Sequence, residues 1–177
     1  MKSGNKCKFA IVNSSPKKIV IASPNFLIAE GIRNFFKSNG FVSISLVENQ
    51  DLLERTLIKE VPDYVLIDDS ANQFKVEKTI AFLSFTKPAQ TILLTNTINQ
   101  ERFELLKKVG VRYFISSEIS REELFNLMQF MELEKEFSDY KVKRRLAFDA
   151  EEAFRNTCAE LNISEREVEI IKLMSAS

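Results

Sequence analysis

The stretch PDYVLIDD, residues 62–69, constrains the fold of this chain more than any other. Its apolar run ends abruptly in two adjacent carboxylates, Asp68 and Asp69. A continuous apolar run of this length is typical of a strand that is buried on both faces of a parallel sheet. Open sheets of this kind bind their ligands at the carboxyl ends of the strands. The pattern therefore predicts a buried strand that delivers Asp68 to a functional edge.

Other apolar runs alternate with helical stripes from Lys18 onward. They are KIVIAS at 18–23, FVSISLV at 41–47, QTILLTN at 90–96 and VRYFISS at 111–117. This regular alternation predicts five βα units, and hence an α/β fold with a parallel sheet and helices on both of its faces. Three of these runs end in small polar residues, which we expect to gather around Asp68.

The C-terminal third carries signals for a long helix. Ser120 and Glu123 form a capping box, which predicts the start of a fifth helix. Farther on, Leu133, Phe137 and Tyr140 recur at helical spacing in a strongly charged stretch, so we expect this helix to continue out of the domain. The stripe is either a surface for a partner helix or a face that packs against its own domain.

Composition excludes several classes of function. The 25 basic residues balance the 25 acidic ones, so the whole chain has no field that would attract nucleic acid or an anionic membrane. The only cysteines, Cys7 and Cys158, lack metal-ligand spacing, and histidine is absent, which removes the usual zinc ligand and general base. No run is apolar for long enough to span a bilayer. We therefore expect a cytoplasmic protein with no membrane partner.

The chain contains the segments IVIASPNFLIAEGI, PDYVLIDD, GVRYFISSEISREEL and ISEREVEIIKLM in this order. These four segments resemble the LuxR-type response regulators of bacterial two-component systems. IVIASPNFLIAEGI is similar to their opening IVIADDHPLxREGL, PDYVLIDD to PDVVLLDL, and GVRYFISSEISREEL to GAxGYLLKxxxxEEL. Near the C-terminus, ISEREVEIIKLM is similar to LTxRExEVLxLx, the start of the helix-turn-helix domain of that family. The four segments follow one another in the order and at the spacing of the family, which makes chance similarity improbable.

The resemblance implies a fold and a division of the chain. It implies a flavodoxin-like, five-stranded parallel sheet of order 2-1-3-4-5, followed by a helical C-terminal extension. The expected parts are an N-terminal extension at 1–17, a receiver-like domain at 18–131, a helical linker at 132–160, and the start of a truncated helix-turn-helix domain at 161–177. On this interpretation, the protein contacts DNA only through the missing C-terminal part.

The resemblance also assigns roles to residues of the predicted edge. Asp68 takes the position of the phosphoacceptor, and Thr95 and Phe114 take the two switch positions. The remaining site positions are degenerate. Ser23 and Pro24 stand where the family has a pair of acidic residues that help to hold Mg²⁺, Asn96 stands where it has a small residue, and Ser117 stands where it has a lysine.

Electrostatics predicts that these losses matter. Mg²⁺ needs carboxylate oxygens, and only Asp68 and its neighbour Asp69 remain. No cation would neutralise the charges of a phosphodonor and these carboxylates. Their repulsion is about 4 kcal/mol for each pair of unit charges 4 Å apart in an effective dielectric near 20. Such a repulsion slows transfer by about three orders of magnitude. We therefore expect no metal, no cofactor and no enzymatic activity. The alternative to a phosphoacceptor role for Asp68 is that of a strand-end carboxylate that accepts hydrogen bonds from loop amides.

Three functions remain open at this stage. The first is a phosphorylation-independent pseudo-receiver that regulates transcription through protein contacts. It would act as a homodimer, since a two-fold partner could cover the stripe at Leu133, Phe137 and Tyr140, and an upstream signalling protein is a further expected partner. The second is a working Mg²⁺-dependent phosphoacceptor that uses Asp68, with Asp69 as a metal ligand. The third is a flavodoxin-like ligand binder, although the chain lacks a Gly-rich phosphate loop.

Overall fold

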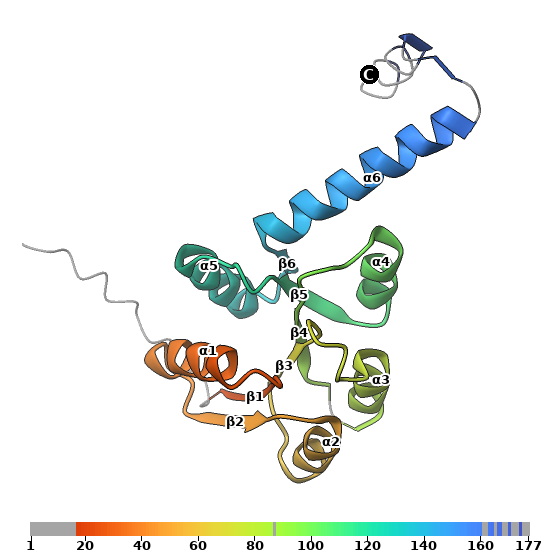
Figure 1. The fold of residues 1–177 in the computed structure, drawn as a ribbon. Helices are drawn as coiled ribbons and strands as arrows, with labels where there is room; N and C mark the ends of the chain where they lie inside the picture. Colours follow the sequence, from red (N-terminus) through yellow and green to blue (C-terminus); the bar gives the residue numbers. More distant parts are fainter. Residues whose placement is uncertain are drawn as a thin grey trace, which may run out of the picture.

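The computed structural model describes residues 17–86 and 88–160, together with 163, 164, 166, 167, 170 and 174. These residues build one parallel sheet of six strands in the order β2-β1-β3-β4-β5-β6, with helices on both faces (Figure 1). The predicted order of the first five strands, 2-1-3-4-5, is confirmed, and a sixth strand extends the sheet beyond β5. Apart from Lys17, the expected N-terminal extension lies outside the described residues, as does most of the segment at 161–177.

Each strand is followed by one helix up to β6, which leads into a last, long helix. The elements are β1 (Lys18–Ala22), α1 (Phe26–Ser38), β2 (Ser43–Val47), α2 (Gln50–Lys59), β3 (Tyr64–Asp68), α3 (Val76–Thr86), β4 (Gln90–Leu94), α4 (Gln100–Lys108), β5 (Val111–Ile115), α5 (Arg121–Glu132), β6 (Phe137–Ser138) and α6 (Tyr140–Glu160).

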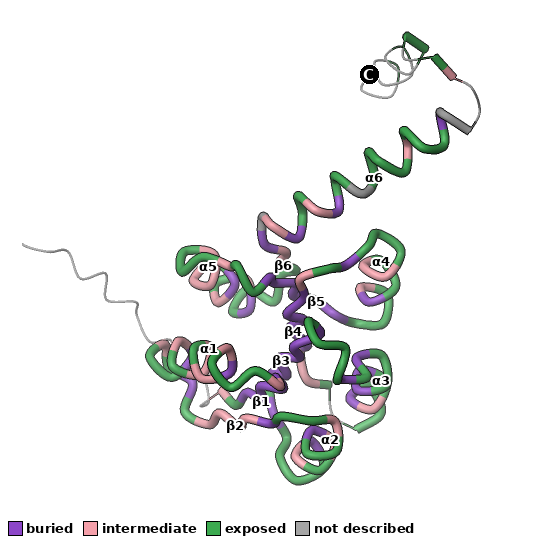
Figure 2. The backbone as a smooth tube through the Cα atoms, viewed as in Figure 1, coloured by how far each residue is buried: buried purple, intermediate pink, exposed green. Residues whose placement is uncertain are grey.

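Strand β3 forms the centre of the core, and all of its residues are buried (Figure 2). Because side chains alternate along a strand, Val65 and Ile67 face one side of the sheet, whereas Tyr64 and Leu66 face the other. The first side packs against α2, α3, α4 and the start of α6. The second side packs against α1 and α5. The helices therefore cover both faces, as the apolar run at β3 predicts.

Short polar side chains begin most of the helices. The amide oxygens of Asn25, Asn49 and Asn99 accept hydrogen bonds from the first turns of α1, α2 and α4. The capping box predicted at Ser120 and Glu123 is confirmed at the start of α5. These caps fix where each helix leaves the carboxyl edge of the sheet.

The predicted continuation of the fifth helix through Tyr140 is wrong. Helix α5 ends at Glu132, and the chain turns back through Glu134, which has a φ of 53°. Phe137 then enters β6, where it pairs with Tyr113 of β5 and packs against Phe130 with the ring centroids 5.4 Å apart. Adding a strand to the sheet buries this phenyl ring better than a projecting helix would.

The stripe of three residues is consequently divided among different elements. Leu133 follows the end of α5 and is 63% exposed, whereas Phe137 is half-buried in β6. Tyr140 begins α6, and its side chain is not among those that the structure describes. Leu133, Phe137 and Tyr140 therefore do not form one helical face, and the linker expected at 132–160 is a turn, a strand and a helix.

Helix α6 is 21 residues long and stands out from the body of the domain (Figure 1). Its first turns are anchored, because Val142 and Leu146 are buried in the core beside α4 and β5. None of the helices in the described part of the chain is long and apolar enough to cross a membrane.

Asp139 fixes the start of α6. Its carboxylate accepts a hydrogen bond from the backbone N–H of Val142 at 2.8 Å and another from the backbone N–H of Ser116, which follows β5. Its own N–H donates to the carbonyl oxygen of Phe114 at 3.0 Å. The side chain is thus an N-cap and a tether to the sheet at the same time.

We predict that Asp139→Ala loosens α6 without unfolding the sheet. Removal of the cap and the tether leaves two backbone N–H groups without their acceptor, at a cost of about 1–3 kcal/mol. Amide hydrogen exchange should accelerate at Val142 and Leu146 but not in β3. Asp51→Ala, in the exposed first turn of α2, is the matched control, and equal exchange at α6 in both variants would contradict the proposed role of Asp139.

Candidate functional site

The carboxyl ends of four neighbouring strands meet at one edge of the sheet, as the sequence predicts. Parallel pairing of β1 with β3, β3 with β4, and β4 with β5 aligns these ends. They place Ser23, Asp68, Thr95 and Ser116 in the interior, each almost completely buried. This edge is the candidate functional site, because polar side chains at the ends of parallel strands are where α/β sheets bind ligands.

Asp68 lies at the centre of the edge and is 0% exposed. The hydroxyl group of Ser23 donates to its Oδ2 at 2.6 Å. The backbone N–H of Ser70 donates to its Oδ1 at 3.0 Å, and the hydroxyl of Ser70 donates to the same oxygen. Both carboxylate oxygens therefore have donors from within the chain, in the arrangement of a carboxylate that organises a loop.

Ser23 links this carboxylate to helix α1. Its Oγ accepts a hydrogen bond from the backbone N–H of Asn25 at 3.1 Å, and Asn25 is the N-cap of α1. Pro24, which is half-buried between them, has no side-chain group that could bind a metal ion. Where the resemblance implies two acidic residues, the structure thus has a hydroxyl that is bonded to Asp68 and a pyrrolidine ring.

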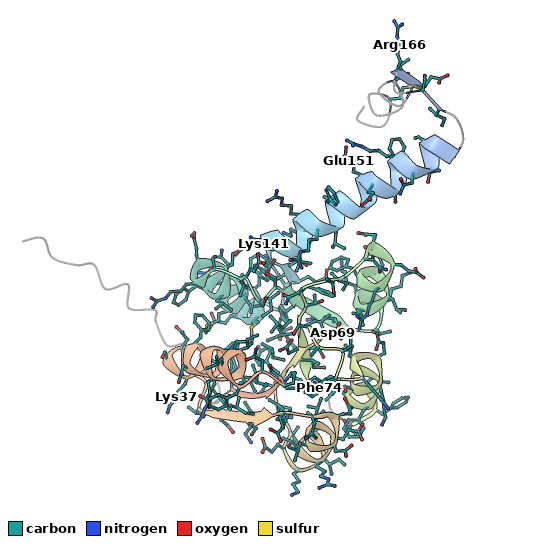
Figure 3. All side chains as sticks on the ribbon, viewed as in Figure 1. Lys37, Asp69, Phe74, Lys141, Glu151 and Arg166 are labelled. Atoms are coloured by element: carbon teal, nitrogen blue, oxygen red, sulfur yellow. The ribbon has the colours of Figure 1, made fainter. Side chains whose placement is uncertain are left out.

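Asp69 is held by a partner that the sequence analysis did not identify. Asp69 lies in the body of the domain (Figure 3), and its side chain is buried, with a residue exposure of 5%. Arg102 of α4 binds both of its oxygens, with Nη1–Oδ2 at 2.8 Å and Nη2–Oδ1 at 3.2 Å. Asp69 is therefore not solvated, although its carbonyl oxygen accepts a hydrogen bond from the backbone N–H of Asn72 at 3.2 Å and so begins a turn. The guanidinium also lies 3.6 Å from the carboxylate of Glu77. No spacing rule connects the two partners, because 33 residues separate them.

Burial determines the protonation behaviour of Asp69. It raises the pKa of this carboxyl group, and the hydrogen bonds and charge of Arg102 oppose the increase. The neighbouring carboxylates of Glu77 and Asp68 raise the pKa further. The negative charge of Asp69 therefore depends on Arg102, and a metal ion at this place would have to compete with the guanidinium.

The residues present do not fit a magnesium site. Asp68 is bonded through both oxygens, Asp69 is bound by a guanidinium, and Ser23 and Pro24 offer no carboxylate. Among the residues that the structure describes, no group of three or more Asp, Glu, Cys or His side chains could hold a metal ion. Mg²⁺ prefers octahedral oxygen ligands and usually binds through one or two carboxylates. At this edge, both carboxylates already have partners within the chain.

Two of the degenerate positions pair with each other. The amide oxygen of Asn96 accepts hydrogen bonds from the backbone N–H of Ser117 at 3.1 Å and from its hydroxyl at 2.6 Å. The hydroxyl of Thr95, the first switch position, donates to the carbonyl oxygen of Thr97 at 3.1 Å. The loops after β4 and β5 are thus joined by neutral hydrogen bonds, where the resemblance implies a lysine.

The second switch position, Phe114, is fixed in the core. Its ring is 1% exposed and packs on Phe103 of α4 with the centroids 4.5 Å apart. Val142 and Leu146 of α6 belong to the same buried cluster. An outward rotation of this aromatic ring would therefore have to displace α4 or α6.

A cavity of about 580 Å³ opens beside the edge, between the loop after β4 and helix α6. Its lining residues are Asn96, Thr97, Ile98, Asn99, Arg102 and Arg145. The cavity lies on the α4 side of the edge, and neither Ser23 nor Asp68 lines it.

We predict that Arg102→Gln destabilises the domain in a pH-dependent way. Loss of the guanidinium raises the pKa of Asp69 further, and a group whose pKa is raised by folding loses stability as the pH rises through that value. The variant should lose about 2–4 kcal/mol of unfolding free energy at pH 8 and clearly less near pH 5. Urea denaturation at the two pH values measures the difference.

Arg33→Gln is the control for Arg102→Gln. Arg33 forms an exposed ion pair with Glu30 at 2.9 Å, so its loss should change stability by less than about 1 kcal/mol at either pH. A destabilisation by Arg102→Gln that is equally large at pH 5 and pH 8 would contradict the dependence of Asp69 on the guanidinium.

The similarity of this chain to known proteins lies in its structure. No protein-family model matches the sequence, and no curated protein matches it either. The structure resembles the isolated REC domain of RcsB from Salmonella enterica serovar Typhimurium, with a TM-score of 0.63, 16% identity, and coverage of 75% of this chain and 99% of that domain. It also resembles a LuxR-family two-component response regulator from Aurantimonas sp. SI85-9A1, with a TM-score of 0.64, 14% identity, and coverage of 77% and 99%.

A third similar structure contains two RcsB dimers bound to two parallel DNAs. Its TM-score is 0.62 at 17% identity, and the match covers 73% of this chain and 66% of that one. At these identities the likeness shows the fold alone. The fold that places Asp68, Thr95 and Phe114 around one edge is therefore that of the receiver domains of response regulators.

Proposed function

We propose that this chain is the regulatory, receiver-like part of a LuxR-type transcription regulator and that it works without phosphorylation. It acts through protein contacts as a homodimer and catalyses no reaction. The observation that carries the proposal is the buried Asp68 carboxylate, whose two oxygens accept hydrogen bonds from Ser23 and Ser70.

The receiver fold and the sequence motifs together support the regulatory class. The fold is found in response regulators of the LuxR family and in RcsB. The motifs at 19–32 and 62–69 resemble the same family, and they lie at the strand ends where a receiver carries its site. One line of support rests on backbone geometry and the other on residue types.

The chemistry of the edge supports loss of phosphorylation. A phosphoryl group brings two negative charges, which a working site must neutralise with a metal ion and a cation. Arg102 is a cation at this edge, but its charge is already matched by Asp69 and Glu77. A phosphodonor would also have to break the hydrogen bond between Ser23 and Asp68.

The competing function is that of a working phosphoacceptor. It is favoured by the retention of Asp68 and Thr95 at the ends of neighbouring strands. It would require Asp69 to leave Arg102 and bind Mg²⁺ together with Asp68. The tests below separate the two functions directly.

Homodimerisation and DNA contact are part of the proposal as well. RcsB dimers bind DNA in one of the similar structures. In this chain the segment that resembles a helix-turn-helix opening is at 163–174, beyond α6. We therefore assign DNA contact to the C-terminal side of α6 and regulation to the receiver-like part.

We predict that the protein is not modified by small phosphodonors. Incubation with acetyl phosphate and about 10 mM Mg²⁺ should leave its intact mass unchanged, because the site lacks the charges that the transfer needs. A mass increase of one phosphoryl group that disappears in Asp68→Asn would overturn the proposal in favour of the working phosphoacceptor.

Restoring the family residues should restore the chemistry, at least in part. The variant that combines Ser23→Asp, Pro24→Asp, Asn96→Ala and Ser117→Lys regains the carboxylates, the open approach and the cation. It should bind Mg²⁺ and accept a phosphoryl group on Asp68, which intact mass would reveal. The same four substitutions combined with Asp68→Asn are the control and should remain unmodified.

We further predict that Asp68→Asn leaves the assembly state unchanged. The asparagine amide oxygen can still accept from Ser70, and the hydroxyl of Ser23 can rotate to accept from the amide N–H, so the fold should lose about 1 kcal/mol or less. Sedimentation velocity should give the same association for the wild type, for Asp68→Asn, and for either protein with beryllofluoride and Mg²⁺. A beryllofluoride-dependent shift in the wild type alone would contradict phosphorylation-independent action.

A further inference from the structure

One face of α6 carries a cation, an aromatic ring and an anion in a single row. Arg144, Phe148 and Glu152 follow each other at i, i+4 and i+8, so they lie along one ridge of the helix. All three are exposed, and Phe148 is 66% exposed. We call these three residues the α6 ridge. An isolated exposed phenylalanine needs no explanation, but flanking charges of opposite sign at equal spacing define a symmetric pattern.

The α6 ridge lies on the side of the helix that faces away from its anchor. By the 100° turn per residue, Phe148 is about 160° around the helix from Leu146 and about 120° from Val142, the two residues that anchor α6 to the body. The helix itself projects from the body, and side chains along its length face solvent (Figure 3). A second helix can therefore approach the ridge without displacing the anchor.

We propose that two copies of this chain pair through antiparallel α6 helices, across a two-fold axis that passes through Phe148. Across this axis, a residue that precedes Phe148 by a given number of positions faces the residue of the second copy that follows Phe148 by the same number. Arg144 of each copy then faces Glu152 of the other, and the two Phe148 rings meet at the centre. This inference rests on the homodimer of the proposed function and names its interface.

The next positions along the helix contribute little to the pairing. The axis also exchanges Arg145 with Glu151, but each is already paired within its own chain, Arg145 with Glu118 at 4.0 Å and Glu151 with Arg155 at 2.9 Å. Farther out, Lys141 would face Arg155, two like charges. Each of these cations is already paired within its own chain, Lys141 with Glu118 and Arg155 with Glu151, both at 2.9 Å. Their mutual repulsion is thereby reduced.

Charge also selects the orientation of the pair. A parallel arrangement in register would place Arg144 against Arg144 and Glu152 against Glu152, so that every pair on the ridge repels. The antiparallel arrangement turns the same residues into attractive pairs. A two-fold axis of this kind gives an isologous, closed dimer, in which one surface is complementary to itself.

The size of the surface limits the strength of the association. The ridge spans about two turns of helix. Even if the contact extended over about four turns, two single helices would bury less surface than the roughly 1,200 Å² of a standard stable interface. We therefore expect a weak dimer, with a dissociation constant on the order of 10⁻⁵ to 10⁻⁴ M, that weakens as salt screens the exposed charges.

Sedimentation equilibrium of the whole chain over about 10 µM to 1 mM tests the pairing. Phe148→Glu should weaken the association at least tenfold, because it places two carboxylates at the centre of the contact. Phe85→Glu on α3 is the matched control, since Phe85 is 91% exposed and outside the ridge, and it should leave the association unchanged. Circular dichroism checks that both variants retain their helices.

Charge-reversal variants distinguish this interface from other possible dimer contacts. Arg144→Glu alone and Glu152→Arg alone should each weaken association several-fold, since each creates repulsive pairs. The double variant Arg144→Glu, Glu152→Arg should recover wild-type association, because the axis exchanges the two positions. Failure of the double variant to recover, in a protein that keeps its helical content, would overturn the antiparallel pairing.

The remaining outcomes are distinguishable. A dimer that persists unchanged in Phe148→Glu would overturn the α6 interface and leave the proposed homodimer in place. A wild-type chain that stays monomeric up to 1 mM would overturn both the interface and the homodimer. Neither result alters the proposal for Asp68, which the phosphodonor experiment decides separately.

Discussion

The constraint on which the rest of the structure depends is the burial of two adjacent carboxylates at the end of β3. An unpaired buried charge is costly, so each carboxylate has to find its own partners. Asp68 takes hydroxyl and amide donors from Ser23 and Ser70, which positions the loops after β1 and β3. Asp69 takes the guanidinium of Arg102, which fixes the first turn of α4 against the sheet. The acids that make this edge look like a reaction site are thus the residues that hold its loops together.

A third buried carboxylate repeats this arrangement at the other end of the edge. Asp139 is almost completely buried, and it joins the amide group after β5 to the first turn of α6. The hydrogen bond between Asn96 and Ser117 joins the two loops in between. A cation and a phosphoryl group would have to replace several of these contacts at once, and each replacement leaves a buried group without its partner. In the proposed pseudo-receiver, this cooperativity means that a single substitution at the edge does not restore a phosphorylation site.

The fold could be predicted from the sequence because its main signals are local. Buried parallel strands such as β3 read as continuous apolar runs, and the capping box at Ser120 marks a helix start with neighbouring residues. The partners of the buried acids could not be predicted, because Asp69 and Arg102 meet only in the folded chain. The turn after α5 was missed for a different reason. Leu133 and Phe137 are four residues apart, which fits a helix, but pairing of Phe137 with β5 outweighs that local pattern.

A receiver that signals must have two arrangements of similar free energy, and a ligand can shift them only as far as its affinities for the two differ. In this chain, one arrangement of the edge is held by hydrogen bonds between neutral groups and by ion pairs within the chain. Phe114 is enclosed by α4 and α6. In the proposed regulator, this arrangement takes the place of the one that a phosphoryl group would select. Helix α6 differs, since only its first turns are anchored and the rest is exposed. Pairing through an exposed helix is governed by concentration and salt. In the proposed regulator, the amount of protein in the cell would thus take the place of the phosphoryl signal.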